Sequence, residues 1–175
     1  MSEQVKKTEG DENLVTLSTG VVLRAKQANP LLLIKVMAQD PQPKPPLVTV
    51  PQMGNKEVEN YEDPNYIERL ENWKSRYSER LLNVMLGEGT EVVSVPKGVP
   101  KLDEDSWVEK LRIYDVDVTN KGNKDWRYIN WVTTVACGDE KDLKKIQTLV
   151  QKLSGVSEED VEQATSFPGS DEKSG

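Results

Sequence analysis

The chain has 175 residues, of which 30% are charged and 35% hydrophobic, and its formal net charge is −7. This length fits one domain with a modest core and is too short for two full domains. The acidic balance argues against nucleic-acid binding, because such surfaces normally carry an excess of lysine and arginine. The longest apolar runs are far shorter than the roughly 20 residues needed to span a bilayer, so no membrane segment is expected.

The sequence contains one cysteine, Cys137, and no histidine. No disulfide can form within the chain, and serine or cysteine nucleophile schemes lack the histidine base on which they usually depend. Cys137 lies in an apolar stretch, which favours a buried, inert thiol over a reactive one. We therefore expect a protein that is not an enzyme, with no catalytic residues, no cofactor and no metal.

The N-terminal part of the chain predicts a small antiparallel sheet. Residues 1–12 are polar and charged, which predicts a disordered start that is neither a signal peptide nor an anchor. The β-forming residues 14–17 and 21–23 flank a short turn at Gly20, and this pattern predicts a hairpin. Asn29-Pro30 then opens a short apolar helix, which we expect to pack against a longer helix or a partner.

A proline-rich linker follows at residues 41–46 and imposes an extended backbone. It could be a ligand for an aromatic groove, but a spacer before a strand is the more common use. The β-branched run 47–50 predicts that strand, and residues 53–62 predict a polar loop.

The best-specified element runs from Asp63 to Gly87. Asp63 followed by Pro64 is typical of a helix start, and Gly87 is expected to close the helix in a left-handed conformation. Apolar residues recur between these ends at steps of three and four, at Tyr66, Ile67, Leu70, Trp73, Tyr77, Leu81, Val84 and Met85.

The C-terminal half predicts a strand and four more helices. Residues 90–95 are β-branched and end at a proline, which favours a strand. Asp103 is expected to cap a helix with an inner face of Trp107, Val108, Leu111 and Tyr114. Residues 115–124 predict a loop, and the next helix carries the stripe Trp126, Ile129, Val132, Val135 and Ala136.

A further helix is expected from Asp139 to Gly155, with the apolar face Leu143, Ile146, Leu149, Val150 and Leu153. A short last helix should start at Ser157, before a disordered tail at 167–175. The predicted fold is α+β and mainly α: a small N-terminal antiparallel hairpin or sheet and a body of about five helices, in a single domain over residues 13–166.

Two kinds of motif suggest chemistry but have simpler explanations. The acidic clusters 103–105 and 158–160 fall at predicted helix starts, where negative charge is favoured. Gly54-Asn55-Lys56 and Gly122-Asn123-Lys124 lack the rest of a phosphate-binding loop and are interpreted as turns.

Trp131 sits on a different side of its helix from Trp126, so both cannot face one core. An exposed tryptophan is a good interface anchor, because tryptophan is enriched in binding hot spots. We expect partner binding in a groove between the 64–86 and 125–136 helices. The candidate partner-binding residues are Trp131, Tyr77, Trp73 and Tyr128.

The order of several local motifs resembles that of tail assembly chaperones of long-tailed bacteriophages. These motifs are Leu17-Ser18-Thr19-Gly20-Val21-Val22-Leu23, Asn29-Pro30-Leu31-Leu32, Pro43-Lys44-Pro45-Pro46, Asp63-Pro64-Asn65-Tyr66, Gly89-Thr90-Glu91-Val92, and the stretch from Leu153 to Val161. The resemblance covers roughly residues 14–166, and each motif alone is only turn and cap chemistry.

The resemblance implies a non-enzymatic role in tail morphogenesis. Such a protein binds the tape measure protein, keeps it soluble and helps recruit tail tube subunits, with oligomerisation along the client as an option. It implies a protein of the host cytoplasm that is absent from the mature virion. The alternatives are a structural tail or head–tail completion protein, and a small enzyme, which would need a cleft of converging polar groups.

Overall fold

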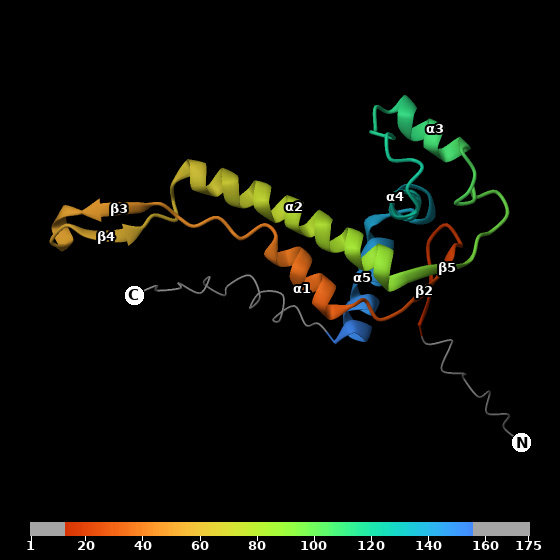
Figure 1. The fold of residues 1–175 in the computed structure, drawn as a ribbon, viewed down its shortest axis with the longest axis horizontal. Helices are drawn as coiled ribbons and strands as arrows, with labels where there is room; N and C mark the ends of the chain where they lie inside the picture. The colour runs from red at the N-terminus through yellow and green to blue at the C-terminus, as the bar shows by residue number, and fades with distance from the viewer. Residues whose placement is uncertain (1–12, 156–175) are drawn as a thin grey trace, which may run out of the picture. The chain divides into compact units, whose positions relative to one another are not determined.

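A computed structural model describes residues 13–155 (Figure 1). These residues form five α-helices and small antiparallel sheets, so the predicted α+β, mainly α class is confirmed. The predictions for residues 1–12, for the last helix from Ser157 and for the tail at 167–175 lie outside the described part. The described residues divide into two compact units, the first made of 13–30 and 82–155 and the second of 31–81. The single domain over 13–166 stays a prediction, and each unit is described by itself.

The first unit contains a three-stranded antiparallel sheet in the order β1-β2-β5. Its strands are β1 (Leu14–Thr16), β2 (Val22–Ala25) and β5 (Thr90–Ser94). The predicted hairpin is confirmed, since Gly20 has a φ of 87° in the turn and the Leu17 amide donates to the Val21 carbonyl at 2.8 Å. The predicted strand at 90–95 is confirmed as β5, which leaves β1 at one edge of the sheet.

Three helices complete the first unit: α3 (Ser106–Ile113), α4 (Lys124–Trp131) and α5 (Glu140–Ser154). The chain continues from α4 into a π-helical turn at Val132–Ala136. As expected, Asp139 caps α5 by accepting from the Asp142 amide, and Gly155 follows it in the left-handed conformation. The largest fully buried side chains of this unit are Trp131, Leu23, Met85, Leu86 and Ile146.

Two expectations for α3 are wrong. The residue at its cap position is Asp105, not Asp103, and the Asp105 carboxylate bonds no helix amide. Its Oδ1 instead lies 2.9 Å from Nη1 of Arg127, because a nearby cation offers a stronger partner than a free amide. Trp107, Val108 and Leu111 are buried as predicted, but Tyr114 is 71% exposed because α3 ends one residue before it.

The inner face of α5 is more polar than its apolar stripe suggests. Ile146 and Val150 are fully buried, whereas the leucines of the predicted face are only half-buried. Asp142 and Ser154 share the buried face. The Ser154 hydroxyl accepts from the Ala28 amide at 3.0 Å, so each of these polar groups has a partner.

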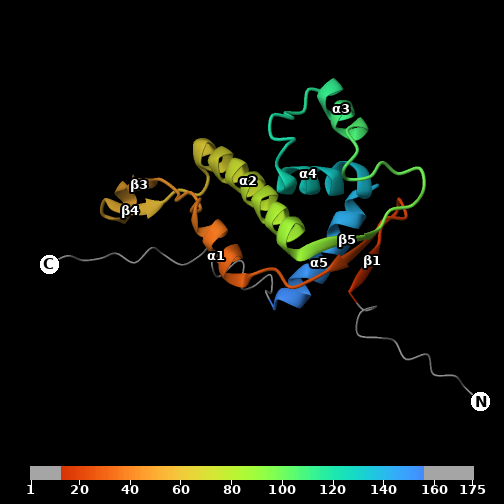
Figure 2. The same cartoon turned by 45° about the vertical axis from the view of Figure 1, so that its right-hand side comes forward.

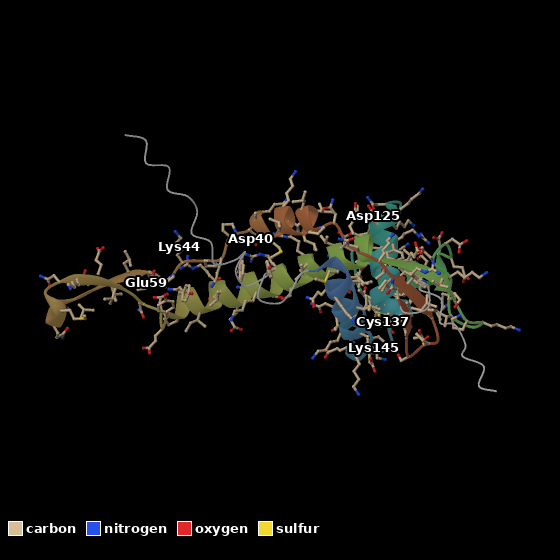
Figure 3. The ribbon with its side chains drawn as sticks, turned by 90° about the horizontal axis from the view of Figure 1, so that it is seen from below. Asp40, Lys44, Glu59, Asp125, Cys137 and Lys145 are labelled. Carbon is tan, nitrogen blue, oxygen red and sulfur yellow. The ribbon has the colours of Figure 1, made fainter. Side chains whose placement is uncertain are left out.

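The second unit contains most of α1 (Pro30–Ala38), the hairpin of β3 (Leu47–Val50) and β4 (Lys56–Glu59), and the first part of α2 (Pro64–Gly89). Asp40, just after α1, holds this unit together (Figure 3). Its carbonyl accepts from Nε1 of Trp73 at 2.7 Å, and its carboxylate lies 3.3 Å from Arg76 and 3.7 Å from Arg80. These contacts join the end of α1 to α2, the neighbour expected for the short apolar helix.

The polar loop expected at residues 53–62 is wrong. A short 3-10 helix at Pro51–Met53 and a turn at Gly54 and Asn55, both with positive φ, lead into β4. Strand β4 pairs with β3 through four residue pairs, from Leu47↔Glu59 to Val50↔Lys56. Because β4 reads Lys-Glu-Val-Glu, a single apolar residue gives no hydrophobic alternation from which to predict a strand.

The start of α2 is confirmed and its end is not. Oδ1 of Asp63 accepts from the Tyr66 amide at 2.8 Å, as expected for an N-cap. The helix does not close at Gly87 but continues to Gly89 and passes directly into β5. The Thr90 hydroxyl donates to the Leu86 carbonyl at 2.7 Å, so a side chain satisfies a helix-end carbonyl that a left-handed glycine would otherwise help to pair.

Candidate interaction site

Trp131 is fully buried, so the exposure expected for it is wrong. Its Nε1 donates to the Pro100 carbonyl at 2.8 Å, which satisfies the only polar atom of the side chain. Of the two tryptophans on α4, Trp126 is the peripheral one: it is half-buried and stacks on Trp107 with ring centroids 6.4 Å apart. The sequence predicts Trp126 in the core and Trp131 at the surface, whereas in the structure Trp131 is the core residue and Trp126 is partly exposed.

Trp73 and Tyr77, two further candidates, stack on each other in the second unit with ring centroids 5.0 Å apart. Trp73 is buried and Tyr77 is half-buried. Burial raises the pKa of Tyr77, and its buried hydroxyl has no hydrogen-bond partner among residues 13–155. This pair therefore serves the packing of its own unit, with one polar atom left unsatisfied.

Tyr128, the fourth candidate, belongs to the first unit and is half-buried. Its hydroxyl lies 2.7 Å from the Thr90 hydroxyl. Because the one Thr90 proton is donated to Leu86, Tyr128 is the donor in this contact. Burial raises the pKa of Tyr128 to about 12. Partner binding by these four residues stays a prediction, but they do not share one exposed surface.

Exposed apolar side chains gather instead on the second unit, where sequence reasoning did not look for them. The large exposed residues there are Leu31, Ile34, Leu47, Val48, Met53, Tyr61 and Ile67. Three of them, Leu47, Val48 and Met53, lie on the β3–β4 hairpin and are called the hairpin surface below. Figure 1 shows this hairpin extending beyond the start of α2.

The hairpin has no buried face. Leu47 is 59% exposed and Met53 is 55% exposed, and no residue of β3 or β4 is buried. A two-stranded hairpin is marginal in water unless a third strand or a helix covers it. The only signal in the sequence for this surface is the β-branched strand 47–50 itself, bounded by prolines.

Asp142 is a fully buried acidic residue of the first unit. Its carboxylate accepts from the Ser18 amide at 3.0 Å, the Ser18 hydroxyl at 2.6 Å and the Gly138 amide at 3.0 Å. Burial alone would raise the pKa of Asp142, but these hydrogen bonds and the nearby Lys145 hold it below its usual value. Because all these partners are structural, Asp142 joins the β1–β2 turn to α5 and has no free oxygen aimed at a cleft.

Cys137 is half-buried beside this group. Burial, together with the negative charges of Asp142 and Asp139, raises its pKa to about 12. A thiol that stays protonated is a poor nucleophile, which agrees with the inert cysteine expected from the sequence.

A hollow of about 600 Å³ lies beside α3 and is lined by Val99, Trp107, Leu111 and Tyr114, among others. The buried Nε1 of Trp107 has no hydrogen-bond partner in the described part of the chain. The guanidinium of Arg127 lies 5.3 Å from the centroid of the Trp107 ring, while its nitrogens bond the carbonyls of Leu102 and Glu104. The hollow is mainly apolar with Lys110 in its lining, and the nearby Arg127 guanidinium is already engaged.

No group of three or more metal-ligating His, Cys, Asp or Glu side chains occurs within residues 13–155. Over the same residues, no helix has both the length and the apolar character needed to cross a bilayer. Comparisons with protein-family models, curated proteins and solved structures gave no match.

Proposed function

We propose that this chain is a tail assembly chaperone of a long-tailed bacteriophage, which binds the tape measure protein and keeps it soluble before the tail forms. The observation that supports a binding role is the hairpin surface, where Leu47, Val48 and Met53 are exposed on a two-stranded sheet. Because successive side chains of a strand point to opposite faces, Leu47 and Val48 leave both faces of this hairpin apolar and uncovered. Uncovered apolar surface is typical of protein interaction sites. The choice of client comes from the resemblance in the order of the sequence motifs.

The hairpin surface fits a client that exposes apolar stripes. Contact would remove Leu47 and Met53 from water and would give the marginal hairpin the extra layer that it lacks. The net charge of −7 would help to keep such a complex soluble. Recruitment of tail tube subunits to the coated tape measure protein belongs to the same proposal.

The test is co-expression with the tape measure protein encoded in the same genome, scored by the fraction of that protein in the soluble lysate. We expect a clear rise in the soluble fraction with the wild-type chain and a loss of most of this rise with Leu47→Asp/Met53→Asp. The matched control is Thr49→Asp/Gln52→Asp, which adds the same charge at exposed polar positions of the same hairpin. A tape measure protein that stays insoluble with the wild-type chain would contradict the proposed function.

Equal rescue by both double variants would instead exclude the hairpin surface as the contact. Mass spectrometry of purified virions separates this proposal from the structural alternative. A chaperone should be missing from the particle, whereas a tail or head–tail completion protein should be present in a fixed ratio to the tube subunits.

A further inference from the structure

A shallow groove of about 700 Å³ lies between strand β1 and helix α5 in the first unit. Figure 2 shows α5 alongside β1 and β5. One wall is β1 itself, and the other consists of Leu149 and Thr148 with four lysines, at positions 141, 144, 145 and 152. Lys145 is labelled in Figure 3. The groove thus combines a strand edge with a row of cations.

The edge of β1 that faces away from β2 has backbone groups available for pairing. Just outside the two ends of β1, the Leu17 amide donates to Val21 and the Ala25 amide donates to Asn13. Asn13, Leu17 and therefore Val15 midway between them are the residues whose backbone groups face β2. In an antiparallel ladder these alternate with residues whose N–H and C=O point the other way. Leu14 and Thr16 therefore present their backbone groups outward, and no other described strand pairs with β1 on that side.

The charge around the groove is opposite to that of the whole chain. Four lysines line it and no acidic residue does, although the formal net charge is −7. The carboxylate of Asp142 lies 3.6 Å from Nζ of Lys145 but is itself fully buried and bonded to Ser18 and Gly138. The side chain of Lys145 is 58% exposed, so its ammonium group remains accessible to a ligand.

We propose that this groove binds an extended, acidic peptide segment of a partner protein, which adds to β1 as a fourth strand of the sheet. The partner backbone pairs with Leu14 and Thr16, and its carboxylates reach the lysines of α5. Strand addition supplies affinity through main-chain hydrogen bonds, and alternate side chains supply specificity. The site belongs to a different unit from the hairpin surface and does not depend on the proposed function.

The test uses the full chain and a short fluorescent peptide of alternating glutamate and valine, with binding measured by fluorescence anisotropy. We expect Lys141→Glu/Lys144→Glu/Lys152→Glu to weaken binding by about tenfold or more, since each reversal replaces attraction by repulsion and Lys145 beside Asp142 is left intact. The matched control is Lys97→Glu/Lys110→Glu/Lys121→Glu, which makes the same charge change at exposed lysines outside the groove and should leave affinity unchanged.

Two further measurements test strand addition itself. Thr16→Pro removes the Thr16 N–H, which points away from β2 and makes no hydrogen bond to it. The substitution should therefore abolish peptide binding while the fold persists. The same peptide N-methylated at alternate residues should also fail to bind, and this readout does not depend on how well the Thr16 variant folds. In NMR spectra of the wild-type chain, the amides of Leu14 and Thr16 should shift on addition of peptide.

The inference is overturned if the peptide does not bind at millimolar concentration, or if the groove and control triple variants bind it equally. Equal binding of the N-methylated peptide would exclude strand addition. A concentration-dependent dimer that Thr16→Pro abolishes would place a second copy of this chain on β1. Tighter peptide binding after Glu158→Gln/Glu159→Gln/Asp160→Asn would place this chain's own C-terminal segment there. Either result would contradict an external partner.

Discussion

At the scale of single residues, Asp142 joins two segments of the first unit that are far apart in the sequence. One buried carboxylate accepts from two backbone amides and one hydroxyl, contributed by the β1–β2 turn and the segment before α5. Removing it leaves the donors of Ser18 and Gly138 without their acceptor, in contacts that are only part-buried because both residues are exposed. The cost is therefore the loss of hydrogen bonds to a charged acceptor.

We predict that Asp142→Ala lowers the free energy of unfolding by about 1.5–3 kcal/mol, the range for losing hydrogen bonds to a charged group. Asp139→Ala, which removes only the α5 cap, should cost about 1 kcal/mol. Glu140→Ala, at an exposed site on the same turn, should change stability by less than about 0.5 kcal/mol. Urea denaturation of the three variants gives the comparison, and similar losses at positions 140 and 142 would contradict the assigned role.

This residue also shows where sequence reasoning stops. Asp142 lies in the first turn of a predicted helix, where an acidic residue is normally explained by the helix dipole. Its main partners, Ser18 and Gly138, depend on the tertiary arrangement, and Ser18 is 124 positions away. Trp131 illustrates the same limit, because periodicity separates it from Trp126 but cannot say which of the two faces the core.

At the scale of elements, the sequence predicts those helix ends that are fixed by capping residues close to them in the chain. The start of α2 at Asp63 and both ends of α5 are confirmed, since capping residues act on backbone groups only a few positions away. The end of α2 and strand β4 were missed, because each depends on pairing with a strand that is distant or unrecognised in the sequence. At the end of α2 the Lys26 amide donates to the Gly89 carbonyl and Thr90 pairs with Ala25 of β2, and β4 pairs with β3. The exposed hairpin surface follows from β4, so it could not be predicted without that strand.

At Gly89 the end of α2 packs so closely against α5 that there is no room for a side chain. A Cβ built on Gly89 would lie 2.4 Å from Cγ1 of Val150, whereas one on Gly87 would meet only Cδ1 of Ile129 at 3.7 Å. We predict that Gly89→Ala costs about 1–3 kcal/mol through overpacking. Gly87→Ala should be neutral or stabilise by up to about 1 kcal/mol, as alanine favours a helix.

The overpacking explanation has its own control. In a Val150→Ala background, where the clashing methyl groups are gone, Gly89→Ala should lose most of its cost. Thermal and urea unfolding of the four variants measure this coupling. Equal effects of alanine at positions 87 and 89 would exclude close packing as the reason for Gly89.

At the scale of the whole molecule, pH should destabilise the fold at both extremes for identifiable reasons. The pKa of Asp142 is lowered from 3.8, so its contribution is present above that pH and is lost as the pH falls through the lower, folded value. The pKa of Tyr128 is raised from 10.0 to about 12. Its contribution is complete below pH 10.0 and is lost as the pH rises towards about 12.

We predict that Tyr128→Phe makes the free energy of unfolding less dependent on pH between 10.0 and about 12. Cys137, whose pKa is raised from 9.0 to about 12, adds to the same loss, so Cys137→Ala should act in the same direction. Urea denaturation across this pH range measures both effects. Tyr114→Phe, at an exposed tyrosine, is the control, and an equal effect there would contradict the role of Tyr128.

The first unit is interrupted in the sequence, since residues 31–81 separate its first strands from the rest. A ribosome therefore delivers the β1–β2 hairpin long before it translates β5, Gly138 and Asp142. Until then the nascent hairpin has its Ser18 turn but not the carboxylate that this turn binds, and β2 lacks the contacts that α5 makes with it. If translation stops before α5, we expect an N-terminal fragment that cannot complete the first unit and that proteases degrade. The first unit can therefore fold only after α5 has been translated.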